Sequence, residues 1–390
     1  MEHTDFHGRA RSGKGIVFSG VRRYIIVPTR SISYWSVVMK SYFRPEIDAM
    51  AGYVPGEQPK MANLVKLNTN ENPYPASPRV REVIAGFDHA KLRRYPEPMA
   101  DTLRDEIAGV LGVKRENIIA GNGSDDILTM TFRAFTAPDR PLACLDPTYS
   151  LYFELAKMQG APVIRIGLDP EDFSMPENLL EQAADANLLI ITRPNAPTGN
   201  SFDRERMRDI CRKFDGIVFF DEAYADFAED NCMEFATEFD NVIVSRTFSK
   251  SYSLAGLRLG YAVGNPEVIG GLFKLKDSYN LDMLTQEIGR AAFADRDYLR
   301  ECCEQVKTTR AYLDAELKKI GFRVVPSQTN FLFAAPPDED GGNYFRRLRE
   351  QAIIVRYFPG EVTGRYVRIT IGTPEEMDHL LDVTRAIYGK

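Results

Sequence analysis

One segment of the sequence places a lysine among hydroxyl side chains, directly after an apolar run and shortly before an arginine. Val242–Val244 has the character of a buried strand, and Lys250 follows it. Burial disfavours the ammonium form of a lysine, so Lys250 could supply the neutral amine that Schiff-base chemistry requires. Thr247, Ser249 and Arg258 are suited to hold a phosphate, two as hydroxyl donors and one as a planar fork. Taken alone, the same segment could be a polar surface loop.

A second segment ends an apolar run on a carboxylate. Ile217–Asp221 has the pattern of a buried strand, and a buried carboxylate at its end needs a cation or hydrogen-bond donors. The protonated ring nitrogen of a pyridoxal phosphate (PLP) cofactor is such a cation. Tyr224, three residues later, could reach the hydroxyl of the same ring. The alternative for Asp221 is a helix cap, which is common after strands in α/β proteins.

A glycine-rich turn precedes an apolar helical pattern. Gly123, Ser124 and Asp125 occupy its end, where the free backbone N–H groups of a helix can bind a phosphate. An ordinary capped turn is the alternative. Tyr149 follows a different apolar run, and its ring could stack on a flat heterocycle.

A proline-rich loop, 193–200, follows the apolar run 188–192 and contains Asn195. Ligands of open α/β sheets bind at this end of the strands. Each of the four segments is weak evidence by itself. Their order is more specific, because a phosphate-type turn, an aromatic ring, an asparagine loop and an aspartate precede a lysine that stands 29 residues after that aspartate.

The segments are spaced as an α/β fold requires. Apolar runs alternate with helical patterns from about residue 100, which predicts a mainly parallel mixed sheet buried on both faces. We expect an N-terminal arm and part of a small domain over residues 39–84, a large cofactor-binding domain over 85–295, and a smaller α+β domain over 296–390. The strands of the large domain are expected at 142–145, 163–166, 188–192, 217–221, 242–246 and 259–263. In the small domain we expect helices at 297–320 and 374–388, with short strands near 322–325, 330–334, 353–356 and 366–371.

Composition excludes several classes of function. The net charge of −6 and the pI near 5.5 argue against a nucleic-acid binder. No stretch of about 18 apolar residues predicts a membrane span. The five cysteines lack paired spacing and the four histidines are scattered, so we expect no metal site and a reduced, cytoplasmic compartment.

Residues 1–38 differ from the remainder, with six basic residues against two acidic ones. A targeting peptide, a disordered arm and a segment translated from a start upstream of Met39 all fit this composition. We favour the last two interpretations.

With these motifs in order, the chain resembles PLP-dependent enzymes of the aspartate-aminotransferase-like fold, and within them the histidinol-phosphate aminotransferases. The resemblance covers about residues 42–390. It is carried by the segments Tyr53–Pro59, Leu67–Tyr74, Arg94–Pro98, Asp221–Tyr224, Ser249–Lys250, Ala255–Arg258 and Arg368–Gly372.

The resemblance implies a role for each matching residue. Lys250 would bind PLP covalently, Asp221 would pair with the ring nitrogen, Tyr224 would contact the ring hydroxyl and Tyr149 would stack on the ring. The phosphate would be held by Gly123, Ser124, Asp125, Thr247, Ser249 and Arg258, and by Tyr95 from the neighbouring subunit of a homodimer. Arg368 would receive the anionic end of the substrate, with Tyr53, Asn72 and Arg356 as further contacts.

The sequence departs from the family in one place. The family has asparagine immediately before Pro-Thr-Gly, whereas this chain has Ala196 there and Asn195 one residue earlier. Either Asn195 substitutes through a small loop shift, or Tyr224 alone binds the ring hydroxyl.

The resemblance implies transamination between histidinol phosphate, a phosphorylated amino alcohol, and the pair 2-oxoglutarate and glutamate. An aminotransferase for aromatic or other amino acids would use the same groups, and so would a lyase that decarboxylates threonine phosphate. A PLP-binding regulator would need a DNA-binding domain, for which residues 1–38 are too short.

Overall fold

The computed structural model describes residues 24–27, 36–39, 41–53 and 56–389. Contacts divide the chain into two units, residues 1–51 and 52–390. In the first unit, β1 (Tyr24–Val27) pairs antiparallel with β2 (Ser36–Met39), and α1 covers Pro45–Asp48. Most of the 1–38 extension lies outside the described residues, so its character stays a prediction.

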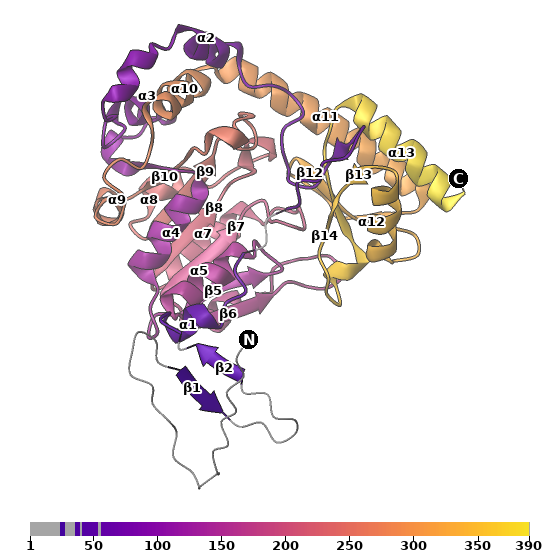
Figure 1. Cartoon of the computed structure of the whole chain (residues 1–390), viewed down its shortest axis with the longest axis horizontal. Coiled ribbons are helices and arrows are strands. Elements are labelled where there is room, and N and C mark those ends of the chain that lie inside the picture. The colour runs from indigo at the N-terminus through magenta and orange to yellow at the C-terminus, as the bar shows by residue number, and fades with distance from the viewer. Residues whose placement is uncertain (1–23, 28–35, 40, 54–55, 390) are drawn as a thin grey trace, which may run out of the picture. The chain divides into compact units, whose positions relative to one another are not determined.

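The second unit is built on a seven-stranded sheet with the order β4-β10-β9-β8-β7-β5-β6 (Figure 1). Only β10 runs antiparallel to its neighbours, so the sheet is mixed and mainly parallel, as the sequence predicts. Its strands are β4 (Ile118–Gly121), β5 (Leu142–Asp146), β6 (Val163–Gly167), β7 (Leu188–Thr192), β8 (Ile217–Asp221), β9 (Val242–Thr247) and β10 (Gly260–Gly264). The sequence did not predict β4, and the other six differ from the expected bounds by at most one residue at either end.

Both faces of this sheet are buried, because successive side chains of each strand enter different apolar clusters. On β8, for example, Phe219 belongs to one cluster and Phe220 to the other. The face that carries Phe219 is covered by α4 (Ser124–Phe135), α5 (Leu151–Gln159) and α9 (Pro266–Phe273). Helices α4 and α5 lie across the sheet in Figure 1. The other face is covered by α3 (Asp101–Leu111), α7 (Arg204–Lys213), α8 (Phe235–Glu238) and α10 (Met283–Ala294), with α2 (Pro78–Gly86) packed on α10.

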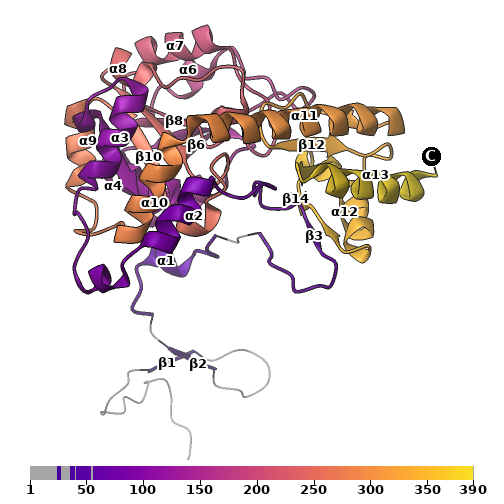
Figure 2. The same cartoon turned by 90° about the horizontal axis from the view of Figure 1, so that it is seen from above.

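A second, antiparallel sheet has the order β11-β12-β15-β14. Its strands are β11 (Arg323–Val324), β12 (Phe331–Ala335), β14 (Arg356–Tyr357) and β15 (Val367–Thr370), and β13 (Ile353–Ile354) pairs separately and in parallel with β3 (Val65–Lys66). The associated helices are α11 (Arg296–Ile320), α12 (Gly341–Glu350) and α13 (Pro374–Tyr388). Helix α11 is long enough to pack against η3 (Ala225–Phe227) near the large sheet and against β12 of the small one (Figure 2).

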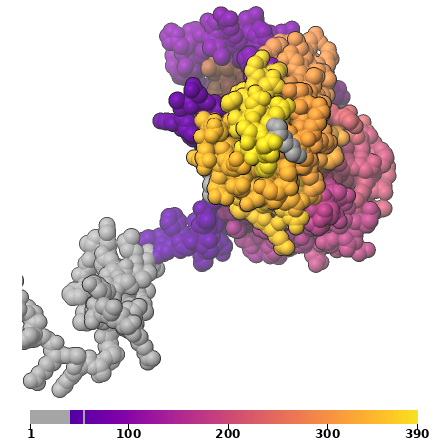
Figure 3. Space-filling model, turned by 90° about the vertical axis from the view of Figure 1, so that its right-hand side faces the viewer, coloured from indigo at the N-terminus to yellow at the C-terminus, as the bar shows by residue number. Residues whose placement is uncertain are grey.

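The segments from α11 onward form most of the face seen in Figure 3, in orange and yellow. Residues 52–390 form one compact unit by their contacts. The expected domain boundaries after residues 84 and 295 both fall inside this unit, and they stay predictions. Short helices complete the unit: α6 (Leu179–Gln182), η1 (His89–Arg93), η2 (Arg115–Asn117), η4 (Ala255–Leu257) and η5 (Thr363–Arg365). Within the described residues, none of the helices has the length and apolar character that crossing a membrane requires.

The strand directions bring the chemistry-bearing segments together. Strands β4, β5, β7, β8 and β9 all end at one edge of the sheet, and β10, running the other way, begins there opposite Gly121 and Thr247. Side chains that follow the parallel strands, and Arg258 before β10, therefore meet at this edge.

Candidate active site

A cavity of about 330 Å³ opens at this edge. Its wall combines residues after the parallel strands with the segment from Asn68 to Glu71 and with β14 and β15 of the small sheet. Most of the site residues expected from the sequence line it: Tyr53, Ser124, Asp125, Tyr149, Asp221, Tyr224, Thr247, Ser249, Lys250, Arg258, Arg356 and Arg368.

Lys250 lies three residues beyond the end of β9. Its Nζ donates a hydrogen bond to the carbonyl oxygen of Thr69 (2.9 Å) and lies 5.9 Å from the centre of the Tyr224 ring. Burial and, secondly, the positive charge of Arg368 lower the pKa of Lys250 to about 8. A substantial fraction of this amine is therefore neutral near physiological pH, as a nucleophile or a general base requires.

Asp221 ends β8 and is buried. Its Oδ1 accepts a hydrogen bond from the backbone N–H of Ala223 (3.2 Å), and its Oδ2 accepts one from the Tyr152 hydroxyl (2.6 Å). Asp221 is not a helix cap, because the next helix, η3, begins after Tyr224. No lysine or arginine of the described chain forms an ion pair with Asp221. Burial raises its pKa to about 6. A carboxylate in this state would be stabilised by a cationic N–H group placed in the cavity.

A cradle for an anion forms where α4 begins. Gly123 has φ +80°, a backbone conformation that favours glycine, and a Cβ there would lie 2.6 Å from Nη2 of Arg258 and displace the guanidinium. Arg258 donates to Asp125 Oδ2 (3.1 Å) and to Ser249 Oγ (3.4 Å), and Thr247 donates to the same Ser249 oxygen (3.0 Å). A helix N-terminus, two hydroxyls and a guanidinium are the donors that a phosphate monoester needs.

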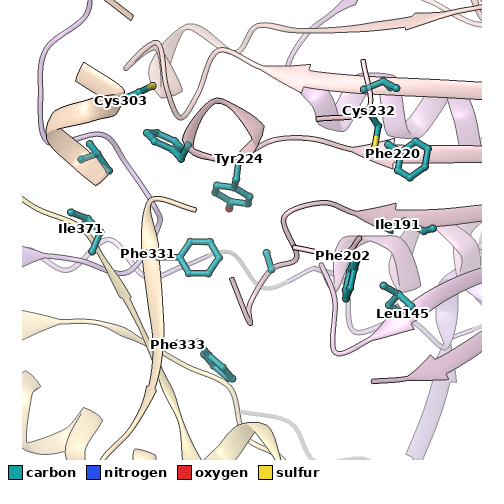
Figure 4. Close-up of a cluster of buried hydrophobic side chains, with 14 of the residues drawn as sticks. Leu145, Ile191, Phe202, Phe220, Tyr224, Cys232, Cys303, Phe331, Phe333 and Ile371 are labelled. Atoms are coloured by element: carbon teal, nitrogen blue, oxygen red, sulfur yellow. The ribbon is translucent and has the colours of Figure 1, made fainter. Parts of the chain in front are cut away.

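Two tyrosines shape the middle of the cavity. The Tyr224 hydroxyl accepts a hydrogen bond from Asn70 Nδ2 (2.8 Å), and burial raises its pKa. Tyr149 approaches Asp125 Oδ1 through its hydroxyl (3.4 Å), and its ring meets the Tyr53 ring edge-on at 5.9 Å. Figure 4 shows Tyr224 beside Phe331 of β12, where the rings meet edge-on at 5.2 Å between the two sheets.

A second group of cations belongs to the small sheet. Arg368 of β15 donates through Nη2 to the carbonyl oxygen of Asn68 (3.0 Å), while its Nε is buried without a hydrogen-bond partner. The guanidinium carbon lies 5.2 Å from the Phe331 ring centre and 5.3 Å from that of Phe358. Burial and the neighbouring Arg356 lower the pKa of Arg368, so an anion bound here would relieve both effects.

Four expected residues do not line the cavity. Gly123 has no side chain to place in the cavity, and it instead leaves room for Arg258, as described above. Asn72 lies behind Lys250 and donates to the carbonyl oxygens of Lys250 (3.1 Å) and Ser251 (3.2 Å). Asn195 is buried and donates to the carbonyl oxygen of Pro147 (3.1 Å) and to Thr198 Oγ1 (2.7 Å), whereas Ala196 faces the cavity. Tyr95 is 77% exposed.

The sequence reasoning missed two residues that contact the expected ones. Asn70 has φ +56°, and it bonds Tyr224 on one side and Thr370 on the other, through its backbone N–H (3.0 Å) and its side chain (3.1 Å). Its place within the segment Leu67–Tyr74 was the available signal. Tyr152 lies one helical turn after Tyr149, and helical spacing alone does not distinguish it from a core residue.

The donor set fits a flat, cationic, phosphate-bearing ring. The cradle at Arg258 suits the phosphate, and Lys250 supplies an amine. Asp221 is buried and forms no ion pair with any described lysine or arginine, so a cationic ring nitrogen would suit it. A metal ion has no comparable site, since the described residues contain no group of three or more His, Cys, Asp or Glu side chains arranged to hold one.

Comparisons with known proteins agree with this reading. The family model for aminotransferase class I and II matches residues 62–383. The chain is 45% identical over 345 residues to a histidinol-phosphate aminotransferase of Geobacter sp. (strain M21), covering 88% of this chain and 98% of that protein. It is 42% identical over 344 residues to histidinol-phosphate aminotransferase 1 of Trichormus variabilis, covering 88% and 97%.

Solved structures support the fold. The histidinol-phosphate aminotransferase of Sinorhizobium meliloti, solved in complex with pyridoxal-5'-phosphate, aligns with a TM-score of 0.80 at 24% identity, covering 89% of this chain and 99% of that one. The aspartate aminotransferase of Thermus thermophilus with maleate aligns with a TM-score of 0.71 at 21% identity, covering 83% and 91%. The aspartate-aminotransferase-like fold expected from the sequence is thus confirmed.

Proposed function

Because this chain belongs to the histidinol-phosphate aminotransferases of the class I and II aminotransferase family, we propose that it transfers the amino group of histidinol phosphate to 2-oxoglutarate. The products are imidazole acetol phosphate and glutamate, and the cofactor is PLP. One observation carries the proposal beyond the family: a single cavity joins an amine of lowered pKa, a buried carboxylate without a cation, and two separate groups of anion-binding residues.

Two of these features would hold the cofactor. The start of α4 would hold its phosphate, with Arg258, Thr247 and Ser249 as side-chain donors. Asp221 would pair with its ring nitrogen, and the negative charge of the carboxylate would favour the protonated form of that nitrogen. Bound PLP supplies the electron-withdrawing ring that makes the Cα–H bond of an attached amine acidic.

Lys250 moves the proton. With a pKa of about 8, its amine would be able to accept and give back the proton of the substrate carbon near neutral pH. The carbonyl oxygen of Thr69 accepts a hydrogen bond from the lysine side chain, and the Asn72 side chain donates one to the lysine's backbone carbonyl oxygen. Asn70 holds the Tyr224 hydroxyl through a hydrogen bond. Tyr224 would then make the contact with the ring hydroxyl that Ala196 cannot make.

Arg368 and Arg356 would bind the substrate's anionic end. The same pair accepts the phosphate of histidinol phosphate in one half of the cycle and a carboxylate of 2-oxoglutarate in the other, because a guanidinium fork pairs with either anion. Tyr53 borders this part of the cavity. Its ring packs edge-on against Tyr149, so the two tyrosines form one side of the substrate region.

The enzyme is proposed to work as a cytoplasmic homodimer. Tyr95 is 77% exposed and stacks on Tyr279, which is itself 46% exposed, with ring centres 4.5 Å apart. Two adjoining exposed aromatic rings favour burial against a second copy, from which Tyr95 would reach the neighbouring phosphate. Sedimentation of the purified chain as a monomer would contradict this assignment.

The test uses the purified chain loaded with PLP. Histidinol phosphate, phenylalanine and threonine phosphate are added separately, and the absorbance of the lysine-bound cofactor is followed. We expect loss of that band with histidinol phosphate alone, and formation of glutamate when 2-oxoglutarate is added. Loss with phenylalanine alone would indicate an aromatic aminotransferase, and release of carbon dioxide from threonine phosphate would indicate the lyase. Absence of a band, or full activity in Lys250→Ala, would refute PLP chemistry at this lysine.

A further inference from the structure

A chain of three hydroxyl groups begins in the cavity wall, passes through a buried tyrosine and ends on Asp221. Tyr152 Oη lies 2.6 Å from Asp221 Oδ2, Thr192 Oγ1 lies 2.9 Å from Tyr152 Oη, and Thr148 Oγ1 lies 3.2 Å from Thr192 Oγ1. Tyr152 has no exposed surface and does not line the cavity, whereas both threonines and the aspartate do. The proposed function gives these three hydroxyl groups no role.

The chemistry of the groups fixes the direction of the hydrogen bonds. An ionised carboxylate only accepts, so the single proton of the Tyr152 hydroxyl points to Asp221. The Tyr152 oxygen then accepts from Thr192, and the Thr192 oxygen accepts from Thr148. All three bonds donate toward the carboxylate, and such aligned bonds polarise one another and strengthen the last one.

The other groups around Asp221 favour its protonated, neutral form. Asp125 at the start of α4 and Glu222 next in the chain both act to raise the pKa of Asp221, in addition to burial. Tyr152 and the Ala223 N–H are the two donors that oppose this rise, and Tyr152 is the larger contributor. Tyr224 lies on the segment that follows, and within the described residues its hydroxyl accepts from Asn70 and forms no hydrogen bond with Asp221.

We propose that Tyr152 is a positioning residue, which keeps the Asp221 carboxylate ionised and oriented toward the cofactor, with Thr192 and Thr148 as the hydroxyl chain that supports it. The inference rests on the proposed function, since it needs a cationic ring nitrogen in the cavity. A purely structural tyrosine would fill volume between α5 and β7, and Phe would replace it with little effect on Asp221.

The test compares cofactor binding to the full-length, cofactor-free chain across pH 5.5 to 8.5 in Tyr152→Phe and wild type. Tyr344→Phe is the matched control, because Tyr344 is equally buried and its hydroxyl lies 2.6 Å from a threonine, Thr384, far from any carboxylate of the site. The cofactor's own titrations are common to all variants, so differences between the pH profiles report on the protein.

Affinity in the wild type should fall as the pH drops through the pKa of Asp221. In Tyr152→Phe this midpoint should rise by about one pH unit, which weakens binding about tenfold below it, while Tyr344→Phe should match the wild type. Overlapping profiles for Tyr152→Phe and wild type would overturn the inference and leave the proposed function intact. A wild-type chain that neither binds PLP nor forms glutamate would overturn both.

A second pair of variants decides the matter if Tyr152→Phe does not fold. Thr192→Val removes the hydroxyl that supports Tyr152, and Thr192→Ser retains it. We expect a smaller rise of the same midpoint in Thr192→Val and a wild-type midpoint in Thr192→Ser. Equal profiles for these two variants would contradict the hydroxyl chain.

Discussion

Replacing Lys250 by methionine should stabilise the chain when no cofactor is bound. Methionine matches the length of the lysine stem but carries no charge. In the folded state the pKa of Lys250 is lowered from 10.5 to about 8, because of burial and then Arg368. At 1.36 kcal/mol for each pKa unit, folding with a protonated Lys250 costs about 3 kcal/mol of stability.

The pH dependence follows from the sign of this shift. Below pH 8 the lysine is protonated in both states, so the full cost is present. Between pH 8 and 10.5 the unfolded chain binds more protons than the folded one, and stability rises with pH. The advantage of Lys250→Met should therefore fall from about 3 kcal/mol at pH 7 to about 1.4 kcal/mol at pH 9.5.

Urea unfolding of the cofactor-free chain at these two pH values measures both quantities. The exposed Lys60 provides a control, since Lys60→Met should change the stability by less than about 0.5 kcal/mol at either pH. A Lys250→Met advantage that stays constant between pH 7 and 9.5 would show that added apolar contact, and not the removed charge, is responsible. No advantage at pH 7 would refute the reasoning.

Three further predictions concern the two anion-binding regions. Arg258→Gln should weaken PLP binding about 10- to 100-fold in equilibrium titrations, because it removes the charged donor of the cradle; unchanged affinity would place the phosphate elsewhere. Gly123→Ala should lower the free energy of unfolding by about 1–3 kcal/mol, because φ is +80° and the new methyl group meets Arg258. Gly109→Ala, on an exposed position of α3 with open space around it, should instead be neutral or stabilising, and equal losses would argue against the backbone explanation. Arg368→Gln should raise KM for histidinol phosphate about 10- to 100-fold with a smaller change in kcat, as loss of ground-state binding predicts, and a reduced kcat at constant KM would contradict its assignment to the substrate's anionic end.

The large sheet was predictable because its strands are continuous apolar runs. Strands such as Leu188–Thr192 and Ile217–Asp221 are buried on both faces, so nearly every position is apolar. This apolar pattern is visible in the sequence without knowledge of the neighbouring elements. The strand Ile118–Gly121 escaped prediction because three apolar residues before a glycine turn carry too little periodicity. The run near 353–356 was expected as one strand but divides into β13 and β14, since its halves pair with different partners.

The site was predictable where chain position determines function. Residues such as Asp221 follow parallel strands, and parallel strands end at one edge of a sheet. Asn70 and Tyr152 could not be assigned in this way, because their importance comes from contacts with Tyr224 and Asp221 that only the folded chain creates. The role of Asn195 stays a prediction: its Nδ2 bonds the carbonyl oxygen of Pro147, while its Oδ1 has no hydrogen-bond partner among the described residues.

The bonds between the segment around Asn70 and the small sheet have a consequence for synthesis. Thr370 and Arg368 bond to Asn70 and Asn68, 300 positions earlier, so one wall of the cavity joins two distant parts of the chain. On the ribosome, Lys250 emerges well before Arg368 and Thr370, and a nascent chain at that stage has the reactive amine but lacks the part of the wall that β15 contributes. The binding site is therefore completed late, after β15 has left the ribosome, and the cofactor binds to a nearly complete chain.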